Sequence, residues 1–271
     1  FRTDLPPFGP VAVKAPWRRF PGGSYGAGVD CRALLRQERA LAAWAAANGL
    51  PAAAPYALYE TDAQDLLVSA YVEGDEVPPD PAGLGALLRR LHDAPPPDLV
   101  PVVHGPSGDF RTAIAARILE RLDRVEALIG EPLAGDRTWL DAEALRAALP
   151  DGRRALLHLD FRPANLRCRD GRILAVLDWS NAALADPAFE LARMHEAGTL
   201  TGAVLAGYGD CDWSSRVPPA ALAACHLDAA LMFAIVFRIG EPDPARAAAA
   251  TARAGVLLEE LRTALGAQGS P

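Results

Sequence analysis

The segment His158–Ala182, with the sequence HLDFRPANLRCRDGRILAVLDWSNA, constrains the fold more than any other part of the chain. It places two carboxylates and an amide beside apolar runs, because Asp160 and Asn165 follow ALLHL and Asp178 follows ILAVL. A carboxylate among apolar residues costs free energy unless cations or hydrogen bonds compensate for the lost water. These acids therefore indicate a site that supplies such compensation.

The same segment predicts a β-hairpin that gathers these polar groups. Two apolar runs within Leu166–Leu177 flank the turn residues Arg169-Asp170-Gly171, which are typical of a tight hairpin connection. The returning strand would bring Asp178 beside the loop that holds Asp160 and Asn165. Carboxylate and amide oxygens are the ligands that Mg²⁺ prefers, usually together with waters and phosphates. We therefore expect a site for a metal ion and phosphate here.

Lys14 is the only lysine in the chain, although lysine and arginine together number 27. A general preference for arginine explains the many arginines but not why one position kept lysine. Lysine is a compact point charge on a flexible stem and arginine a planar fork, so a site that needs one can reject the other. Lys14 lies in Val11–Ala15, a β-branched run that predicts a strand, with Phe1–Thr3 as the end of a preceding strand.

Glu38 lies on the apolar face of a predicted helix. The helix begins after Asp30, a favourable N-cap, and stops at Gly49. Its apolar stripe includes Leu34 and Leu41, and Glu38 falls on the same stripe at helical spacing. A carboxylate on a face directed at the core needs a cation, whereas a glutamate at the edge of the stripe would reach water.

The remaining patterns predict short strands and amphipathic helices. We expect strands at Ala57–Glu60, Asp65–Val72 and Ala155–His158, and helices at Leu84–Asp93, Phe110–Ile129, Asp141–Leu149, Pro187–Glu196, Pro219–Arg238 and Pro244–Leu265. The glycine-rich segment Pro16–Gly28 matches neither GxGxxG nor GxxxxGK[ST], so we interpret it as a connecting loop. The order predicts an α+β protein with a strand-rich lobe over residues 1–73, a hinge at about 70–74 and a larger helical lobe over 74–271.

Charge and composition exclude several classes of partner. A net charge of −7 argues against nucleic acids and anionic membranes. The apolar stretch Ala229–Phe237 is too short to span a bilayer. The four cysteines form no CxxC pair and no ligand spacing with histidine, which indicates free thiols in a reducing cytoplasm. We expect four histidines to be surface or packing residues: His92, His104, His195 and His226.

The order of these motifs resembles the aminoglycoside phosphotransferases and their kinase-like relatives, which include choline kinases. HLDFRPAN, followed after 13 residues by DW, is similar to the family signature H-x-D-x-x-x-x-N … D-[WF]. AYVEG, LRRLHDA and ADPAFELA are similar to further motifs of the family. Lys14 and Glu38 match the lysine and the helical glutamate that pair in the family. The resemblance extends from residue 11 to about 200 and implies a two-lobed protein-kinase-like fold.

The resemblance implies a role for each site residue. Asp160 would be the catalytic base, and Asn165 and Asp178 would bind Mg²⁺. Lys14, held by Glu38, would contact the phosphates of ATP or GTP.

Further roles follow from the same resemblance. The backbone of Ala70, Tyr71 and Val72 would hold the adenine edge. His158 would orient the catalytic loop through a hydrogen bond, and Arg162 would face the transferred phosphoryl group unless it is simply a surface arginine.

The chain departs from the family pattern in three places that matter. Phe161 and Arg162 replace residues that are often Leu, His or Gly in the family, so the surface on the substrate side is not typical of any one subgroup. Only 13 residues precede Lys14, where the family has two strands and a nucleotide-covering loop, so we expect the sequence to be a fragment. Glu190 stands where the family usually has aspartate, a change that keeps the charge and is expected to have little effect.

The resemblance implies a kinase that phosphorylates a hydroxyl of a small molecule, but it leaves the substrate open. A cationic alcohol such as an aminoglycoside is one candidate, because the helical lobe carries acids that could form a wall of carboxylates, although solvated surface acids explain them equally well. These acids are Glu196, Asp210, Asp212, Asp228, Glu241 and Asp243. The alternatives are a kinase for a small metabolite such as choline, homoserine or a sugar, and a pseudokinase that binds without catalysis.

Overall fold

The computed structural model describes residues 1–16, 29–133, 135 and 137–268 of the chain. The predicted loop Pro16–Gly28 therefore lies, apart from Pro16, outside the described residues. The chain divides into two compact units, each built from three segments. Unit 1 comprises Phe1–Val102, Ala155–Ala183 and Thr201–Cys211, and unit 2 comprises Val103–Arg154, Leu184–Leu200 and Asp212–Pro271. The lobe boundary near residue 73 is a different division, and it stays a prediction.

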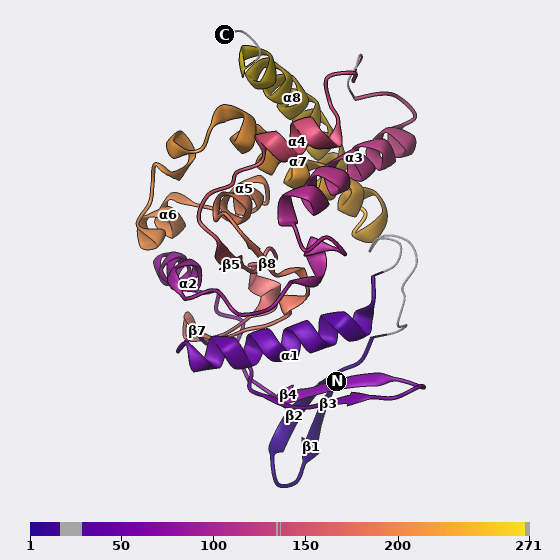
Figure 1. Ribbon diagram of the computed structural model, residues 1–271. Coiled ribbons are helices and arrows are strands. Elements are labelled where there is room, and N and C mark those ends of the chain that lie inside the picture. The colour runs from indigo at the N-terminus through magenta and orange to yellow at the C-terminus, as the bar shows by residue number, and fades with distance from the viewer. Residues whose placement is uncertain (17–28, 134, 136, 269–271) are drawn as a thin grey trace. The chain divides into compact units, whose positions relative to one another are not determined.

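Unit 1 contains an antiparallel sheet of four strands in the order β1-β2-β4-β3 (Figure 1). The strands are β1 (Arg2–Leu5), β2 (Gly9–Lys14), β3 (Pro55–Glu60) and β4 (Asp65–Ala70). The β1–β2 hairpin confirms the strand that was expected before Val11. Lys14 is the last residue of β2 and lies opposite Leu67 in the central strand pair, so the sheet fixes its backbone.

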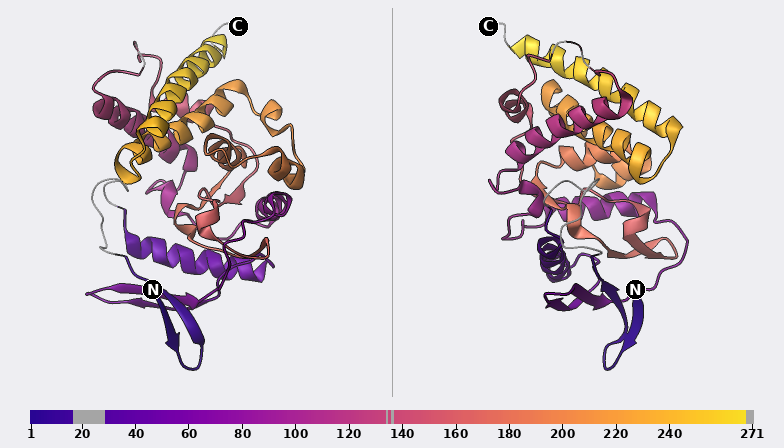
Figure 2. Two further views of the ribbon diagram at one scale, coloured as in Figure 1. Left: turned by 180° about the vertical axis from the view of Figure 1, so that it is seen from behind. Right: turned by 90° about the vertical axis from the view of Figure 1, so that its right-hand side faces the viewer.

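Helix α1 (Cys31–Ala47) runs across this sheet and contacts β3 and β4 (Figures 1 and 2). Asp30 caps it as predicted, because its side chain accepts a hydrogen bond from the backbone N–H of Arg32. The buried stripe differs by one residue from the prediction, since Leu35 is buried and Leu34 only partly so. Glu38 stays on the inner face because it is three residues from Leu35.

The other elements of unit 1 carry the HLDFRPAN segment and two helices. They are α2 (Pro81–Asp93), β5 (Ala155–Leu157), the 3₁₀ turn Pro163–Asn165, β6 (Leu166–Arg169), β7 (Arg172–Val176), the 3₁₀ turn Trp179–Asn181 and α6 (Gly202–Tyr208). The β6–β7 pair confirms the predicted hairpin. Its turn has positive φ at Asp170 (50°) and Gly171 (75°), the backbone that a two-residue hairpin turn requires.

Helices α2 and α6 pack together through glycines. A Cβ atom on Gly85 of α2 would lie 1.9 Å from the carbonyl oxygen of Val204, and one on Gly207 of α6 would lie 2.0 Å from that of Ala82. Real Cβ atoms do not approach backbone this closely, so only glycine allows the contact. The sequence patterns did not predict α6, because seven residues are too few to show a clear helical period.

Unit 2 is mainly helical. Its helices are α3 (Phe110–Ile129), α4 (Ala142–Ala148), α5 (Ala188–Glu196), α7 (Pro219–Ile235) and α8 (Pro244–Gln268), with a π-helical turn at Val236–Gly240 and a 3₁₀ turn at Trp213–Arg216. The 3₁₀ turn Val102–His104 and strand β8 (Ala183–Ala185) lie where the two units meet in sequence. Figure 2 shows α7 and α8 lying side by side.

The length argument against a membrane span was wrong. The continuous helical segment Pro219–Gly240 has 22 residues and a mean hydropathy of 2.0 over its most apolar window, enough to cross a bilayer by length and composition. However, 78% of that window is buried inside the protein. A core helix of a soluble protein has the same properties, so the segment is weak evidence for a membrane span.

Asp228 of α7 is a buried charge that joins α7 to α3. Its carboxylate accepts two hydrogen bonds from Arg117, at 3.0 and 2.6 Å, and one from Arg121 at 2.8 Å. Burial alone would raise the pKa of Asp228, but the two guanidinium groups hold it well below its usual range. Forming such a buried ion group costs free energy because its charges lose their water. Removing one partner strongly destabilises the protein, because the remaining charge is left buried without compensation.

Replacing Gly207 tests the α2–α6 contact. We expect Gly207→Ala to lower the free energy of unfolding by at least about 2 kcal/mol, because the methyl group forces two backbones apart. The matched control is Gly202→Ala in the same helix, where a Cβ would meet nothing within 4 Å and should be neutral or mildly stabilising. Chemical denaturation of both variants measures the difference. Equal free energies of unfolding would show that α2 and α6 do not approach each other this closely.

Replacing Asp228 tests the buried ion group and its pH dependence. We expect Asp228→Asn to lower the free energy of unfolding at pH 7 by about 3–5 kcal/mol, because two arginines lose their counter-charge. Because the folded-state pKa of Asp228 is lowered, its contribution is complete above the unfolded pKa of about 4 and is lost below it. The difference between variant and wild type should therefore shrink as the pH falls below about 4.

The control for Asp228 is a surface pair in the same unit. Asp123 pairs with Arg137 at 2.7 Å and is exposed, so Asp123→Asn should cost less than about 1 kcal/mol. Equal losses of unfolding free energy in Asp228→Asn and Asp123→Asn would contradict the inference that Asp228 joins α7 to α3.

Candidate functional site

The ammonium group of Lys14 joins two carboxylates that are far apart in the sequence. Its Nζ lies 2.5 Å from Oε2 of Glu38 and 2.9 Å from Oδ1 of Asp178. All three residues belong to unit 1, so one ammonium group connects the sheet, α1 and the end of the β6–β7 hairpin. The contact with Glu38 confirms the expected cation, and the contact with Asp178 was not predicted.

These charges retain their ionised forms through mutual compensation. Burial alone would lower the pKa of Lys14, but Glu38 and Asp178 raise it above its ordinary value. Burial would likewise raise the pKa of Asp178, but Lys14 and hydrogen bonds from Ser180 lower it. For Glu38, burial raises the pKa and Lys14 opposes that rise. The raised pKa of Lys14 favours its charged form, which the predicted contact with phosphate requires.

Leu177 holds the loop and the hairpin together through its backbone. Its N–H donates to the carbonyl of Asn165 at 2.8 Å, and its carbonyl lies 3.0 Å from Nε2 of His158. Nδ1 of the same imidazole lies 3.2 Å from the backbone nitrogen of Asp160. His158 is fully buried, and a neutral ring that donates through Nε2 and accepts through Nδ1 satisfies both contacts. The expected loop-orienting hydrogen bond of His158 is therefore present.

Two residues at the site have left-handed backbone conformations that are unfavourable for residues other than glycine. Leu159, before Asp160, has φ of 56°, and Asp178 has φ of 60°. Such conformations persist where the surroundings hold them, and they are common at functional sites. Leu159 lies between His158 and Asp160, which are joined by a hydrogen bond, and Asp178 directly follows Leu177. These surroundings fix the direction in which the two carboxylates leave the chain.

The side chains of Asn165 and Arg162 hold Asp160 from two sides. Nδ2 of Asn165 donates to Oδ2 of Asp160 at 2.7 Å and to its backbone carbonyl at 2.9 Å. Nε of Arg162 lies 3.1 Å from Oδ1 of Asp160. The Arg162 side chain is half exposed and Asp160 only 20% exposed. Arg162 thus lies on the predicted base itself, while a contact with phosphate stays a prediction.

The predicted metal ligands have suitable oxygens. Because Asn165 uses its amide nitrogen for Asp160, its carbonyl oxygen is the atom that can face a metal. Oδ1 of Asp178 accepts from Lys14 and from the hydroxyl of Ser180 at 2.6 Å. Its other oxygen is therefore the better donor for a cation. One amide and one carboxylate oxygen form the partial set of hard ligands that Mg²⁺ takes together with phosphates and water.

The predicted adenine-binding backbone follows the end of β4. The N–H of Ala70 donates to Ala54 at 2.8 Å and that of Tyr71 to Pro10 at 3.2 Å. Both amides are therefore used within the sheet, and an adenine edge would depend on the carbonyl groups and on Val72. The assignment of Ala70, Tyr71 and Val72 to adenine stays a prediction.

Gly74 explains why the segment AYVEG ends in glycine. A Cβ at this position would lie 2.7 Å from the carbonyl oxygen of Cys168 in β6. The next residue, Asp75, donates its N–H to the same carbonyl at 2.8 Å, and its carboxylate accepts from the N–H of Asp170. The chain after β4 is therefore fastened to the hairpin that carries Asp178.

Gln37 is a structural partner of the site that the sequence analysis missed. It is buried, and its amide nitrogen donates to the carbonyls of Trp179 and Ser180 at 2.7 and 3.2 Å. Its oxygen accepts from the N–H of Val102 at 2.7 Å. Gln37 thereby holds α1 against the turn after Asp178. A glutamine on the apolar face, next to Glu38, was the available signal.

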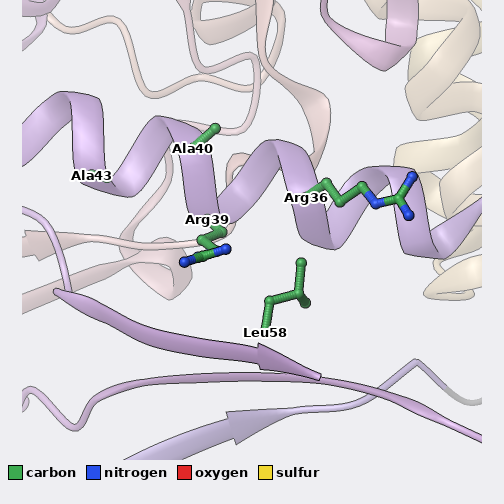
Figure 3. Close-up of a pocket in the computed structure, with 5 residues that line it drawn as sticks. All are labelled: Arg36, Arg39, Ala40, Ala43 and Leu58. Carbon is green, nitrogen blue, oxygen red and sulfur yellow. The ribbon is translucent and has the colours of Figure 1, made fainter. Parts of the chain in front are cut away.

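A surface pocket lies between α1 and β3, on the helix face opposite Glu38. It has a volume of about 300 Å³ and is lined by Arg36, Arg39, Ala40, Ala43 and Leu58. Figure 3 shows Arg39 pointing from the helix toward the strand and Leu58 rising toward the helix. Arg36 is already paired with Glu60 through two hydrogen bonds. Positions 36, 39 and 43 occupy one face of the helix and Glu38 the other, so this pocket is separate from the candidate site.

The predicted wall of acids does not form from all of its members. Asp228 is buried between two arginines. Glu196 is bonded to His226 at 2.7 Å and to Arg253 at 3.2 Å. These two acids have structural partners within unit 2, so they do not supply free negative charge to a cationic substrate.

The ADPAFELA segment has a structural role at the start of α5. The carboxylate of Asp186 accepts from the N–H of Ala188 at the start of α5. Phe189 and Glu190 are buried. Trp179 is also buried in the core.

Comparison with known proteins identifies the family. The sequence profile of the phosphotransferase enzyme family (APH) matches residues 30–224, which include the sites around Glu38, Asp160 and Asp178. A search of curated proteins gave no match.

Solved structures share the fold at low identity. A thermostable mutant of aminoglycoside phosphotransferase APH(4)-Ia, in ternary complex with ADP and hygromycin B, has a TM-score of 0.55 at 21% identity, covering 83% of this chain and 82% of that one. The gentamicin complex of APH(2″)-IIa has a TM-score of 0.56 at 17% identity, covering 93% of this chain and 87% of that one. A choline/ethanolamine kinase family protein from Mesorhizobium loti has a TM-score of 0.54 at 18% identity, covering 95% of this chain and 86% of that one. The chain therefore belongs to the phosphotransferase enzyme family and has the protein-kinase-like fold of its small-molecule kinases.

Proposed function

We propose that this protein transfers the γ-phosphate of ATP or GTP to a hydroxyl group of a small molecule, with Mg²⁺ as the required metal. The observation that carries the proposal is the contact of Lys14 with both Glu38 and Asp178. It joins residues 24 and 164 positions away from Lys14 in one charged cluster. Phosphoryl transfer depends mainly on positioning and on charge stabilisation, which is what such a cluster supplies.

Lys14, Asn165 and Asp178 bind the nucleotide in this proposal. Lys14 contacts the phosphates as a compact cation, and Glu38 keeps its side chain directed at them. Asn165 and Asp178 hold Mg²⁺ through their oxygens. When bound, the metal neutralises the negative charge of the phosphates. Lys14 keeps its proton because its pKa is raised.

Asp160 orients the attacking hydroxyl and accepts its proton. Asn165 fixes one carboxylate oxygen of Asp160 through the 2.7 Å hydrogen bond. Arg162 contacts the other oxygen, so the substrate hydroxyl has to share that oxygen with the guanidinium or replace it. Arg162 is half exposed, and its side chain has room to turn toward a transferred phosphoryl group.

An aminoglycoside is the first substrate class to test, and small metabolite alcohols are the second. Among the solved structures with this fold, one contains hygromycin B with ADP and another contains gentamicin, whereas a third belongs to the choline/ethanolamine kinase family. Asp228 and Glu196 are paired with groups of the protein, which weakens the argument that the substrate is a polycation. The free state of all four cysteines agrees with a cytoplasmic protein, and that location also stays a proposal.

The test is nucleotide consumption by the purified protein with a panel of alcohols. The panel contains aminoglycosides, macrolides, nucleoside antibiotics, choline, homoserine and sugars, each with Mg²⁺ and either ATP or GTP. We expect turnover with one substrate class. Asp160→Asn should reduce kcat by about 10²- to 10⁴-fold, because general base catalysis contributes that much.

The same variant separates catalysis from binding. Asp160→Asn keeps the size of the side chain, so Mg-ATP should raise the melting temperature of variant and wild type alike. A variant with full turnover on the true substrate would refute the role of Asp160. Mg-ATP binding without turnover on any alcohol would favour the pseudokinase instead, and absence of any nucleotide binding would contradict the proposal altogether.

A further inference from the structure

A second cluster of ionisable groups lies in unit 2, away from the residues used above. His195 and Glu196 end helix α5, and His226 lies within α7. One ligand atom from each of the three residues lies within 4.8 Å of the others. Glu196 and His226 are almost buried, with side-chain exposures of 10% and 8%, whereas His195 is 58% exposed. The cluster therefore has a buried floor and one accessible side.

The two imidazole nitrogens converge on one carboxylate oxygen. Nδ1 of His226 lies 2.7 Å from Oε1 of Glu196, and Nδ1 of His195 lies 3.7 Å from the same oxygen. The imidazole rings are 5.1 Å apart and nearly perpendicular. A tetrahedral zinc ion with ligand distances of about 2.1 Å keeps its donor atoms about 3.4 Å apart. The two separations from Oε1 of Glu196 bracket this value, and all three donor atoms lie within 4.8 Å of one another.

The chemistry of the cluster suits zinc. Two neutral imidazoles and one carboxylate are typical zinc ligands, and three protein ligands leave one position for water.

A simpler interpretation is that Glu196 only connects three helices. Arg253 of α8 lies 3.2 Å from Oε1 of Glu196 and 3.6 Å from Glu260. His226 and Arg253 by themselves satisfy the carboxylate, so a purely structural link does not need His195. The convergence of His195 on the same oxygen is what favours a metal. Glu260 offers Arg253 another partner when a metal takes its place on Glu196.

We propose that His195, Glu196 and His226 bind one Zn²⁺ ion in unit 2, with the fourth position open to water. The site is independent of the phosphotransferase function. His226 and Arg253 also line a groove of about 940 Å³ between α7 and α8, so the open position would be reached from solvent. The bound ion would fasten the end of α5 to α7 and stabilise this unit. The ligands show no regular spacing in the sequence because they come from two helices.

The experiment is a zinc titration of the full chain after treatment with a chelator, followed by calorimetry in competition with a chromophoric chelator. We expect one Zn²⁺ per chain. His195→Ala should bind at least about 10-fold more weakly, because metal sites lose roughly this much when their ligand environment is disturbed. His195 is exposed, so this variant should fold normally. Cys211→Ser is the matched control, since Cys211 is an exposed thiol and its loss should leave the affinity unchanged.

A second measurement keeps the proposal testable without relying on the affinity alone. At a free zinc concentration of 100 times Kd, the wild-type melting temperature should rise by about 5 °C, and that of His195→Ala by much less. Co²⁺ in place of zinc should give the visible absorption of a tetrahedral site in the wild type only. Equal zinc affinity in wild type and His195→Ala, or no binding in the wild type, would overturn the proposal.

Discussion

The contact of one ammonium group with two carboxylates organises the candidate site. Lys14 ends strand β2, Glu38 lies on the inner face of α1, and Asp178 follows the β6–β7 hairpin. Each of these charges would be costly in its partly buried place without the others. The cluster therefore requires the sheet, the helix and the hairpin to keep fixed positions, and the glycine contact at Gly74 and the hydrogen bonds of Gln37 serve that requirement.

Hydrogen bonds that involve the backbone hold the loop His158–Asn165 in place. Leu177 connects Asn165 and His158, and the backbone nitrogen of Asp160 contacts the same imidazole. This explains why the polar residues lie beside apolar runs. The apolar residues supply strands that position the loop, while the strained backbone at Leu159 and Asp178 sets the direction of the two acids. Phosphoryl transfer needs such rigid positioning because the protein supplies little covalent chemistry.

Much of this arrangement could be predicted from the sequence. The β6–β7 hairpin and the cap at Asp30 follow from local patterns, and the cost of burying charge predicts a cation for Glu38. The family resemblance, not a local pattern, implied that this cation is Lys14. The contact between Lys14 and Asp178 could not be predicted, because it depends on how a strand and a distant hairpin meet. The partners of Asp228 could not be predicted either, because both arginines lie on α3, far from α7 in the sequence. Short α6 showed no period, and its packing depends on single glycines.

The most direct measurement of the central claim is a double-mutant cycle on Mg-ATP affinity, using Lys14→Met, Glu38→Gln and the double variant. If Glu38 acts by directing Lys14 at the phosphates, the loss of either residue removes most of the shared effect. The account predicts that the double variant binds little worse than Lys14→Met, with a coupling energy of about 1–3 kcal/mol. Losses that add to within about 0.3 kcal/mol would contradict it, because the two residues would then act independently.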